Sequence, residues 1–290
     1  MRILCIGDVV GSIGCEFLRN NLPTLKKVKG VDFVICNGEN SADGNGLTPV
    51  SAKHLFDSGV DAITLGNHSF RRKEVYDCLD SNPFIVRPAN FPENSTPGKG
   101  IINVDTGRRI VSIINIMGNS YMDNNLNCAF ECVDKMIKQA ESKIIIVDFH
   151  AEATGEKRAM GYYLDGRVSA MFGTHTHVQT SDAQVLPKGT GYITDTGMTG
   201  TIRMTPQKTD PHTEPEKPTK APLFQIFPSC LMMTPEPVAS LFGVCTFCLR
   251  VPPLPCPGLP KKPNGSNPAC CSRTRWKRCS PTTFSLWLCV

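Results

Sequence analysis

Short apolar runs alternate with amphipathic stretches through the first 200 residues, and this alternation constrains the fold more than any other feature of the sequence. Runs rich in Ile, Val, Leu and Phe, bounded by Gly, Asn or Asp, predict buried strands at residues 2–9, 31–37 and 61–66. Helical spacing predicts helices at residues 16–28 and 49–58 between them. The chain is therefore expected to open with a βαβαβ unit.

The rest of this part of the chain mixes two kinds of connection. A hairpin, a helix and three more strands are predicted there, at residues 101–104 with 110–116, 128–141, 143–149, 167–172 and 191–194. Strands outnumber helices, and parallel units occur beside a hairpin. This combination favours an α/β sandwich over a purely doubly wound sheet.

Five of the predicted strands run into polar side chains where they end. In open α/β sheets the carboxyl ends of the strands form the edge that binds ligands. If these strands share one sheet, eight side chains converge there: Asp8, Glu39, Asn40, Asn67, His68, His150, His175 and His177. Burying so many carboxyl and imidazole groups is costly without a compensating cation. Oxygen and nitrogen ligands without cysteine indicate iron, manganese or zinc.

Two of the six histidines, His175 and His177, stand two positions apart after a predicted strand. In an extended chain such residues project to the same side, so both are expected to reach the cluster while Thr176 points away. Glu39 could bridge two ions roughly 3.5–4 Å apart, the separation typical of two-metal phosphoryl-transfer sites. A lone strand-end histidine, by contrast, is usually a turn residue or a satisfied polar group, and we assign His54 and His212 to that class.

The composition changes abruptly near Gly200. Residues 1–200 hold 20 Lys and Arg against 22 Asp and Glu, whereas residues 201–290 hold 11 against 4 and carry 16 of the 23 prolines and 8 of the 14 cysteines. Proline removes hydrogen-bond donors and fixes φ, so coil is expected at residues 206–222 and 252–268. We therefore divide the chain into a domain at 1–200 and an atypical Pro/Cys-rich tail at 201–290, either disordered or frameshifted.

The tail admits two interpretations. A genuine extension could bind zinc through its cysteines and contact RNA or phosphate through its basic residues: Cys245, Cys248, Cys256, Cys270, Cys271, Cys279, Arg273, Arg275, Lys277 and Arg278. A single CxxC without a well-spaced second pair is a weak zinc signal. A frameshifted reading past Gly200 accounts better for the sudden change, and we favour it.

The motifs of the first 200 residues closely resemble the calcineurin-like metallophosphoesterases, and within them the bacterial YmdB-type phosphodiesterase branch. The motifs that carry the resemblance are Gly7-Asp8-Val9-Val10-Gly11, Asn37-Gly38-Glu39-Asn40, Gly66-Asn67-His68, Asp148-Phe149-His150-Ala151-Glu152 and Gly173-Thr174-His175-Thr176-His177. The resemblance implies a four-layer α/β/β/α sandwich around two metal ions, with iron expected ahead of manganese. The chain departs from the family at Arg71, where an acid is usual, and throughout its tail.

The resemblance also implies roles for the clustered residues. Asp8, Glu39, Asn40 and His177 would hold one ion, and Glu39, Asn67, His150 and His175 the other, with Glu39 bridging. His68 would act as general acid or stabilise the transition state. A metal-bound hydroxide would attack a phosphodiester. The implied substrates are 2′,3′- or 3′,5′-cyclic nucleotides.

Two classes of function follow. The leading hypothesis is an enzyme, a metal-dependent cyclic-nucleotide phosphodiesterase. The alternative is a non-catalytic, truncated relative that binds metal and acts through a partner; a His-x-His amidohydrolase fits poorly because the histidine pair comes late in the chain. No apolar run reaches the ~20 residues of a membrane-spanning helix. A cytoplasmic homo-oligomer without a membrane partner is expected.

Overall fold

The first half of the chain alternates strands and helices as the periodicity predicts. The computed structural model describes residues 1–92, 96–122 and 125–200, together with two strands at 244–250 and 283–289. Its first elements are β1 (Arg2–Ile6), β2 (Asp8–Val9), α1 (Gly11–Lys29), β3 (Phe33–Asn37), α2 (Pro49–Asp57) and β4 (Ala62–Thr64). The predicted βαβαβ opening is confirmed, with an extra break at Gly7 between β1 and β2.

The remaining elements include several that the sequence analysis does not predict. They are η1 (Lys73–Val75), α3 (Tyr76–Ser81), β5 (Ile85–Val86), β6 (Ile101–Asp105), β7 (Ile110–Met117), α4 (Ala129–Lys138), β8 (Ile145–His150), α5 (Thr154–Leu164), β9 (Ala170–Thr174), β10 (Gln184–Val185), β11 (Gly191–Ile193), β12 (Met198–Thr199), β13 (Val244–Arg250) and β14 (Thr283–Cys289). The predicted hairpin appears as antiparallel β6 and β7. Helix α5 has no counterpart among the predicted elements.

Local sequence signals account for the helix boundaries. Thr48 caps α2 by accepting a hydrogen bond from the backbone N–H of Ser51, and Pro49 occupies the first turn, where its missing N–H is not needed. Helix α1 ends at Gly30, whose φ of 60° is the left-handed conformation that glycine adopts without strain. Both signals are short-range and hold regardless of the tertiary fold.

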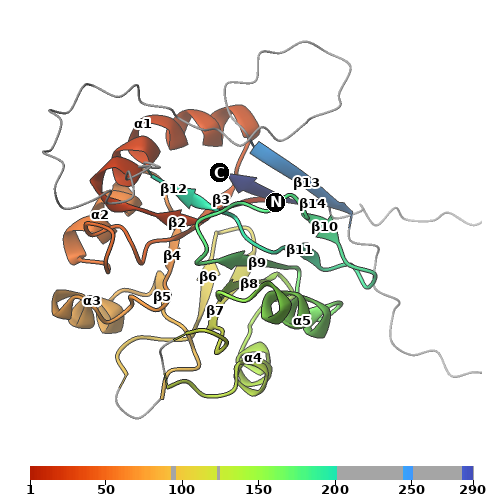
Figure 1. Cartoon of the computed structure of the whole chain (residues 1–290). Coiled ribbons are helices and arrows are strands. Elements are labelled where there is room, and N and C mark those ends of the chain that lie inside the picture. The colour runs from red at the N-terminus through yellow and green to blue at the C-terminus, as the bar shows by residue number, and fades with distance from the viewer. Residues whose placement is uncertain (93–95, 123–124, 201–243, 251–282, 290) are drawn as a thin grey trace, which may run out of the picture.

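The strands form two six-stranded sheets and one small two-stranded sheet (Figure 1). The first large sheet has the order β13-β14-β1-β3-β4-β5 and the second has the order β10-β11-β9-β8-β7-β6. The assumption that the five polar strand ends share one sheet is wrong: β1, β3 and β4 belong to the first sheet, whereas β8 and β9 belong to the second. Local hydrophobic periodicity marks a strand but carries no information about which sheet it joins.

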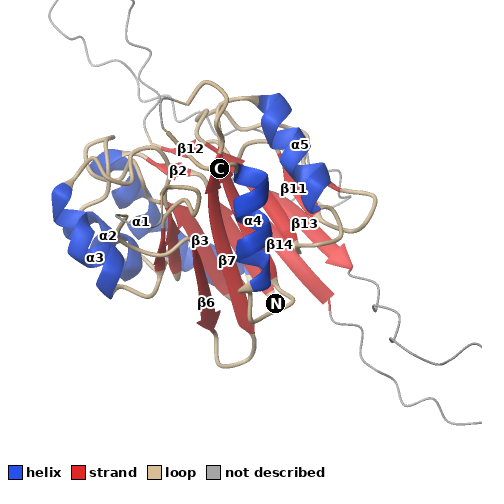
Figure 2. Ribbon diagram, turned by 90° about the horizontal axis from the view of Figure 1, so that it is seen from below, coloured by secondary structure: helices blue, strands red, loops and turns tan. Residues whose placement is uncertain are grey.

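Three apolar clusters hold these elements together. On β1, Leu4 packs with the helix α1 residues Leu18 and Leu22, whereas Ile3 packs with Phe172 of the other sheet. This alternation follows from the two-residue period of a strand. A third cluster joins the far side of the second sheet to α4 and α5, and in Figure 2 these two helices lie across the strands from α1, α2 and α3. The fold is a mixed α/β fold with an apolar core between its two large sheets.

The tail contributes two strands to the first sheet. β14 runs parallel to β1, from Arg2 opposite Ser285 to Ile6 opposite Cys289, and β13 pairs antiparallel with β14. These strands fall within the segment 201–290 that is expected to be disordered or frameshifted. The proposed basic residues and the four cysteines at 256–279 lie outside the described residues, as does His212.

Across the described part of the chain, no helix combines the length and apolar character needed to cross a lipid bilayer. The predicted cytoplasmic location and homo-oligomeric state stay predictions.

The core between the sheets yields a test of the packing. Phe172 is fully buried there, so Phe172→Ala is expected to lower the free energy of unfolding by about 3–5 kcal/mol, through lost apolar contact and the remaining cavity. Urea denaturation measures this loss. The control Val28→Ala, at a helix position that is 71% exposed, should change it by less than about 0.5 kcal/mol. Equal effects of the two changes would contradict the assigned core.

Candidate metal centre

All eight predicted site residues lie where strands of the two large sheets end. Asp8 follows β1 and begins β2; Glu39 and Asn40 follow β3; Asn67 and His68 follow β4; His150 ends β8; His175 and His177 follow β9. The two sheets therefore bring their carboxyl ends to the same place. The convergence predicted from the sequence occurs, but across two sheets instead of along one.

Glu39 lies at the middle of the cluster and is 1% exposed. Its Oε1 is 3.2 Å from Nε2 of His150 and 3.5 Å from Nδ1 of His68. Its Oε2 accepts a hydrogen bond of 2.8 Å from the backbone N–H of His68. One carboxylate thus contacts side chains that come from both sheets.

Asp8 forms the second carboxylate of the cluster. Its Oδ1 accepts a 3.2 Å hydrogen bond from Nδ2 of Asn40 and lies 3.5 Å from Nε2 of His177, and its Oδ2 accepts from the backbone N–H of His175 at 3.1 Å. Burial alone raises the pKa of Asp8. The hydrogen bond from His177 and the charges of His150 and His177 outweigh burial, so the pKa of Asp8 lies below its ordinary value. Asp8 is therefore an anion in this environment.

His150 is fully buried and faces the cluster through Nε2. This atom is 2.8 Å from Oδ1 of Asn67 and 3.1 Å from Nδ1 of His175, and the two imidazole rings meet edge to face at 4.9 Å. Burial opposes protonation, but the negative charge of Glu39 dominates and raises the pKa of His150 to about 9. In the absence of a cation, protonated His150 balances the carboxylate.

His175 and His177 reach the cluster by a different geometry from the predicted one. β9 ends at Thr174, and both histidines have positive φ angles, 100° and 64°, so they are not successive residues of an extended strand. Such conformations cost roughly 1–3 kcal/mol each for residues other than glycine and persist where the surroundings hold them. Thr176 does point away from the cluster, toward Asp195.

A second layer of polar side chains orients the histidines; these residues belong to the motifs of the sequence, but the sequence did not predict this role for them. Thr174 is 2.9 Å from Nδ1 of His150 and donates to Oδ1 of Asp148 at 2.7 Å, which fixes Nε2 as the atom that faces the cluster. Burial raises the pKa of Asp148 to about 7. Glu152 pairs with Nε2 of His175 at 3.1 Å, leaving Nδ1 to face His150. Asp148 and Glu152 flank His150 in the motif Asp148-Phe149-His150-Ala151-Glu152, which is the signal that could have identified them.

His68 stands at the rim of the cluster with a quarter of its side chain exposed. Its Nδ1 lies 2.7 Å from Oδ1 of Asn40, so Nε2 is the ring atom that is left for a ligand. Burial lowers the pKa of His68 despite the opposing charge of Glu39. The pKa of the partly exposed His68 is thus lowered, whereas that of the buried His150 is raised.

The cluster fits divalent cations by its donors and by its space. Glu39, His150 and His175 each offer one ligand atom, and these atoms all lie within 4.8 Å of one another. A Cβ atom at Gly66 would lie 2.3 Å from Nε2 of His150 and 2.4 Å from Oε2 of Glu39, so only glycine leaves the site open there. Two buried carboxylates beside three imidazoles form the oxygen and nitrogen donor set expected for iron, manganese or zinc.

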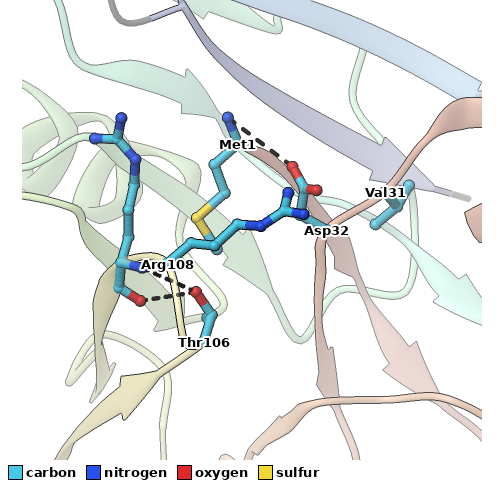
Figure 3. A pocket seen from close by; sticks show the side chains of 6 residues that line it. Met1, Val31, Asp32, Thr106 and Arg108 are labelled. Carbon is cyan, nitrogen blue, oxygen red and sulfur yellow. Dashed lines mark hydrogen bonds and ion pairs between the residues drawn. The ribbon is translucent and has the colours of Figure 1, made fainter.

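A hollow lies away from this cluster, before the amino ends of β1 and β3 (Figure 3). Its volume is about 530 Å³, and its lining includes Asp32, Arg108 and Arg109. None of the eight predicted site residues lines it.

Comparisons with known proteins match the part of the chain that contains this cluster to phosphodiesterase and phosphatase relatives. Residues 4–205 match the family model described as YmdB-like protein. A 2′,3′-cyclic-nucleotide 2′-phosphodiesterase of Bacillus subtilis is 52% identical over 202 residues, which cover 69% of this chain and 76% of that protein. A putative phosphatase/phosphodiesterase of Mycoplasma pneumoniae is 35% identical over 204 residues, or 69% of this chain and 73% of that protein.

Solved structures agree with these sequence matches. A hypothetical protein from Thermus thermophilus superimposes with a TM-score of 0.66 at 46% identity, covering 70% of this chain and 78% of that one. A structure described as a novel phosphatase from Mycoplasma pneumoniae gives a TM-score of 0.63 at 36% identity, covering 67% and 70%. At 46% and 36% sequence identity, both structures share more than the fold with this chain.

Gly66 provides a test of the site geometry. Gly66→Ala is expected to displace His150 and Glu39 and to weaken Mn²⁺ binding by at least about tenfold, because the added Cβ overlaps both side chains. Titration calorimetry measures the affinity, and circular dichroism checks that the fold persists. The control Gly155→Ala, whose Cβ would meet nothing within 4 Å, should bind Mn²⁺ like the parent. Unchanged binding in Gly66→Ala would contradict this geometry.

Proposed function

This chain belongs to the YmdB-like protein family, and on that premise we propose that it is a metal-dependent phosphodiesterase acting on 2′,3′-cyclic nucleotides. The observation that carries the proposal is the 52% identity over 202 residues to a protein named 2′,3′-cyclic-nucleotide 2′-phosphodiesterase. The family match at residues 4–205 includes all eight clustered residues. The buried cluster of carboxylates and imidazoles supports a metal-dependent reaction. Hydrolysis of 3′,5′-cyclic nucleotides belongs to the same proposal as a second substrate class.

We assign two metal positions to this cluster. Asp8, Asn40 and His177 would hold one ion, and Asn67, His150 and His175 would hold the other, with Glu39 shared between them. The contacts of Glu39 to His150 and of Asp8 to His177 support this division. Two bound ions, iron or manganese, would activate water and neutralise charge on the phosphoryl group.

The protein's own groups would orient the substrate and supply a proton. Hydrolysis of a cyclic diester forms one P–O bond to the oxygen of water and breaks one P–O bond to the ribose, and the departing ribose oxygen must gain a proton. His68 would give this proton from Nε2 as the imidazolium, in which Nδ1–H donates to Oδ1 of Asn40 and Nε2–H is left for the departing oxygen. His68 would also stabilise negative charge in the transition state.

The finer description of the fold belongs to the same proposal. A four-layer α/β/β/α sandwich is supported by the three apolar clusters, one beneath α1 and α2, one between the large sheets, and one beneath α4 and α5. Such an arrangement places the site at the carboxyl edge of both sheets.

We further propose that the segment after Gly200 is read in a different frame from the family sequence. The family match ends at residue 205, close to the change in composition, and the B. subtilis relative is matched over 76% of its length. The non-catalytic alternative rests on the same observation, since a chain without the family's terminal sequence could bind metal yet lack turnover. Zinc or RNA binding by the tail stays a prediction.

Catalysis by the cluster is tested with Glu39→Gln. This change removes the shared carboxylate charge, so hydrolysis of a bis-aryl phosphodiester by the Mn²⁺-loaded protein should fall by about 100-fold or more. The matched control Glu16→Gln, at a half-exposed position on α1, should retain activity. A panel of 2′,3′- and 3′,5′-cyclic nucleotides then ranks the substrates. Full activity in Glu39→Gln would refute the shared-ligand role, and two bound equivalents of metal without turnover in the parent would favour the non-catalytic alternative.

The reading-frame proposal is tested on the gene. Translating the two other frames downstream of codon 200 should give, in one of them, a continuation that extends the match to the YmdB-like family. Absence of such a continuation in both frames would contradict the frameshift and favour a genuine extension.

A further inference from the structure

A fully buried ion pair lies beneath the His-Thr-His loop, and the proposed reaction does not use it. Nζ of Lys157, on α5, is 2.6 Å from Oδ2 of Asp195, and the two side chains are 0% and 1% exposed. Asp195 follows β11, in a segment next to the end of β9. Charged pairs are rarely buried so completely, because both groups lose their hydration.

Asp195 connects three separate segments of the chain. Its Oδ2 accepts hydrogen bonds from the backbone N–H and the hydroxyl of Thr176, at 3.2 and 2.8 Å, in addition to its contact with Lys157. Its Oδ1 accepts from the backbone N–H of Gly197 at 2.8 Å. The carboxylate therefore joins α5, the loop after β9 and the turn before β12.

The loop that Asp195 holds carries two histidines in unfavourable backbone conformations. Thr176 is the residue between His175 and His177, and both histidines have positive φ angles. Residues other than glycine keep such angles only where neighbouring contacts fix them. The backbone N–H and the hydroxyl of Thr176 both donate to Asp195, which fixes the loop at its midpoint.

The same carboxylate also constrains Asp8. The backbone N–H of Asp8 donates to the carbonyl oxygen of Gly197 at 3.1 Å, while the N–H of Gly197 donates to Asp195. Gly197 thus links the buried pair to β2, and β12 pairs with β2 from Met198 opposite Asp8. Three of the proposed ligands, Asp8, His175 and His177, lie within two residues or one hydrogen bond of groups bound to Asp195.

The packing around Lys157 is adapted to this arrangement. A Cβ atom at Gly173 would lie 3.0 Å from Cδ of Lys157 and 1.9 Å from the carbonyl oxygen of Thr194. Glycine at this position therefore lets the lysine stem pass beneath β9 toward Asp195. The backbone N–H of Thr196 donates to the carbonyl oxygen of Gly173 at 2.9 Å, which holds the segment after β11 against the end of β9.

We propose that Lys157 and Asp195 are positioning residues that fix His175, His177 and Asp8 in the geometry required for metal binding. Neither side chain contacts the clustered side chains; Asp195 acts through Thr176 and Gly197, and Lys157 acts through Asp195. This inference rests on the proposed function only in taking the cluster as a metal site. A buried pair with a purely structural role would affect stability without changing metal affinity.

Thr176 provides the sharpest test, because it can be changed while both members of the ion pair are kept. Thr176→Val removes the hydroxyl that donates to Asp195, and Mn²⁺ affinity is expected to fall by about 10- to 100-fold in the full chain. Thr176→Ser keeps the hydroxyl and should bind within about threefold of the parent. Titration calorimetry gives the affinities, and the Mn²⁺ electron paramagnetic resonance spectrum reports any change in the site. Equal affinity in the parent and Thr176→Val would overturn the proposal.

Asp195→Asn tests the buried charge, with Asp165→Asn as its matched control. Asp165 is also a buried carboxylate, but it accepts hydrogen bonds from the backbone of Lys188 and Thr190, away from the histidine loop. Asp195→Asn should lose Mn²⁺ affinity by about tenfold or more, whereas Asp165→Asn should bind normally even if its melting temperature falls. Parallel losses of affinity and stability in both variants would assign the pair a structural role only.

The outcome separates this inference from the proposed activity. If Thr176→Val binds Mn²⁺ more weakly than the parent and the parent does not hydrolyse cyclic nucleotides, the positioning role is supported and the phosphodiesterase activity is contradicted. If the parent hydrolyses cyclic nucleotides and Mn²⁺ affinity is unchanged in Thr176→Val and Asp195→Asn, the phosphodiesterase activity is supported and the positioning role is contradicted. A parent protein that binds no Mn²⁺ would contradict both.

Discussion

The burial of two carboxylates among histidines is the interaction on which the rest of this structure depends. Glu39 and Asp8 are almost completely removed from water, and each is contacted by imidazole and amide groups instead. Removing a charge from water is costly unless opposite charge compensates it. Protonated histidine supplies that compensation in the absence of metal, and divalent cations would supply it when bound. The features that surround the cluster, from Gly66 to the second layer of polar side chains, keep these groups close together.

The fold serves this requirement by bringing the ends of two sheets together. The apolar core between the sheets fixes their relative position, so strand ends that are more than 100 residues apart in sequence become neighbours. β4 delivers Asn67 to His150 of the other sheet, and β3 delivers Glu39 to the same imidazole. Loops alone would hold such a site less rigidly, because their backbone conformations are less constrained than those of paired strands.

Much of this organisation can be predicted from the sequence, and the limits have physical causes. Apolar periodicity located β1, β3, β4, β8 and β9, and polar strand ends identified the clustered residues. The assignment of strands to sheets could not be predicted, because side chains such as Ile3 and Phe172 meet only through tertiary packing. The positive φ angles of His175 and His177 also left no local signal, since the loop between them is hydrogen-bonded to Asp195, which is distant in sequence. Supporting residues such as Lys157 resemble ordinary surface residues in sequence and are recognised only by their burial.

The proposed site depends on Glu39 being shared by two metal ions. A crystal structure of the Mn²⁺-loaded protein, with anomalous diffraction collected near the manganese edge, tests this sharing. Two anomalous peaks are expected on either side of the Glu39 carboxylate, one beside Asp8 and His177 and the other beside His150 and His175. A single peak, or peaks that do not contact Glu39, would contradict it.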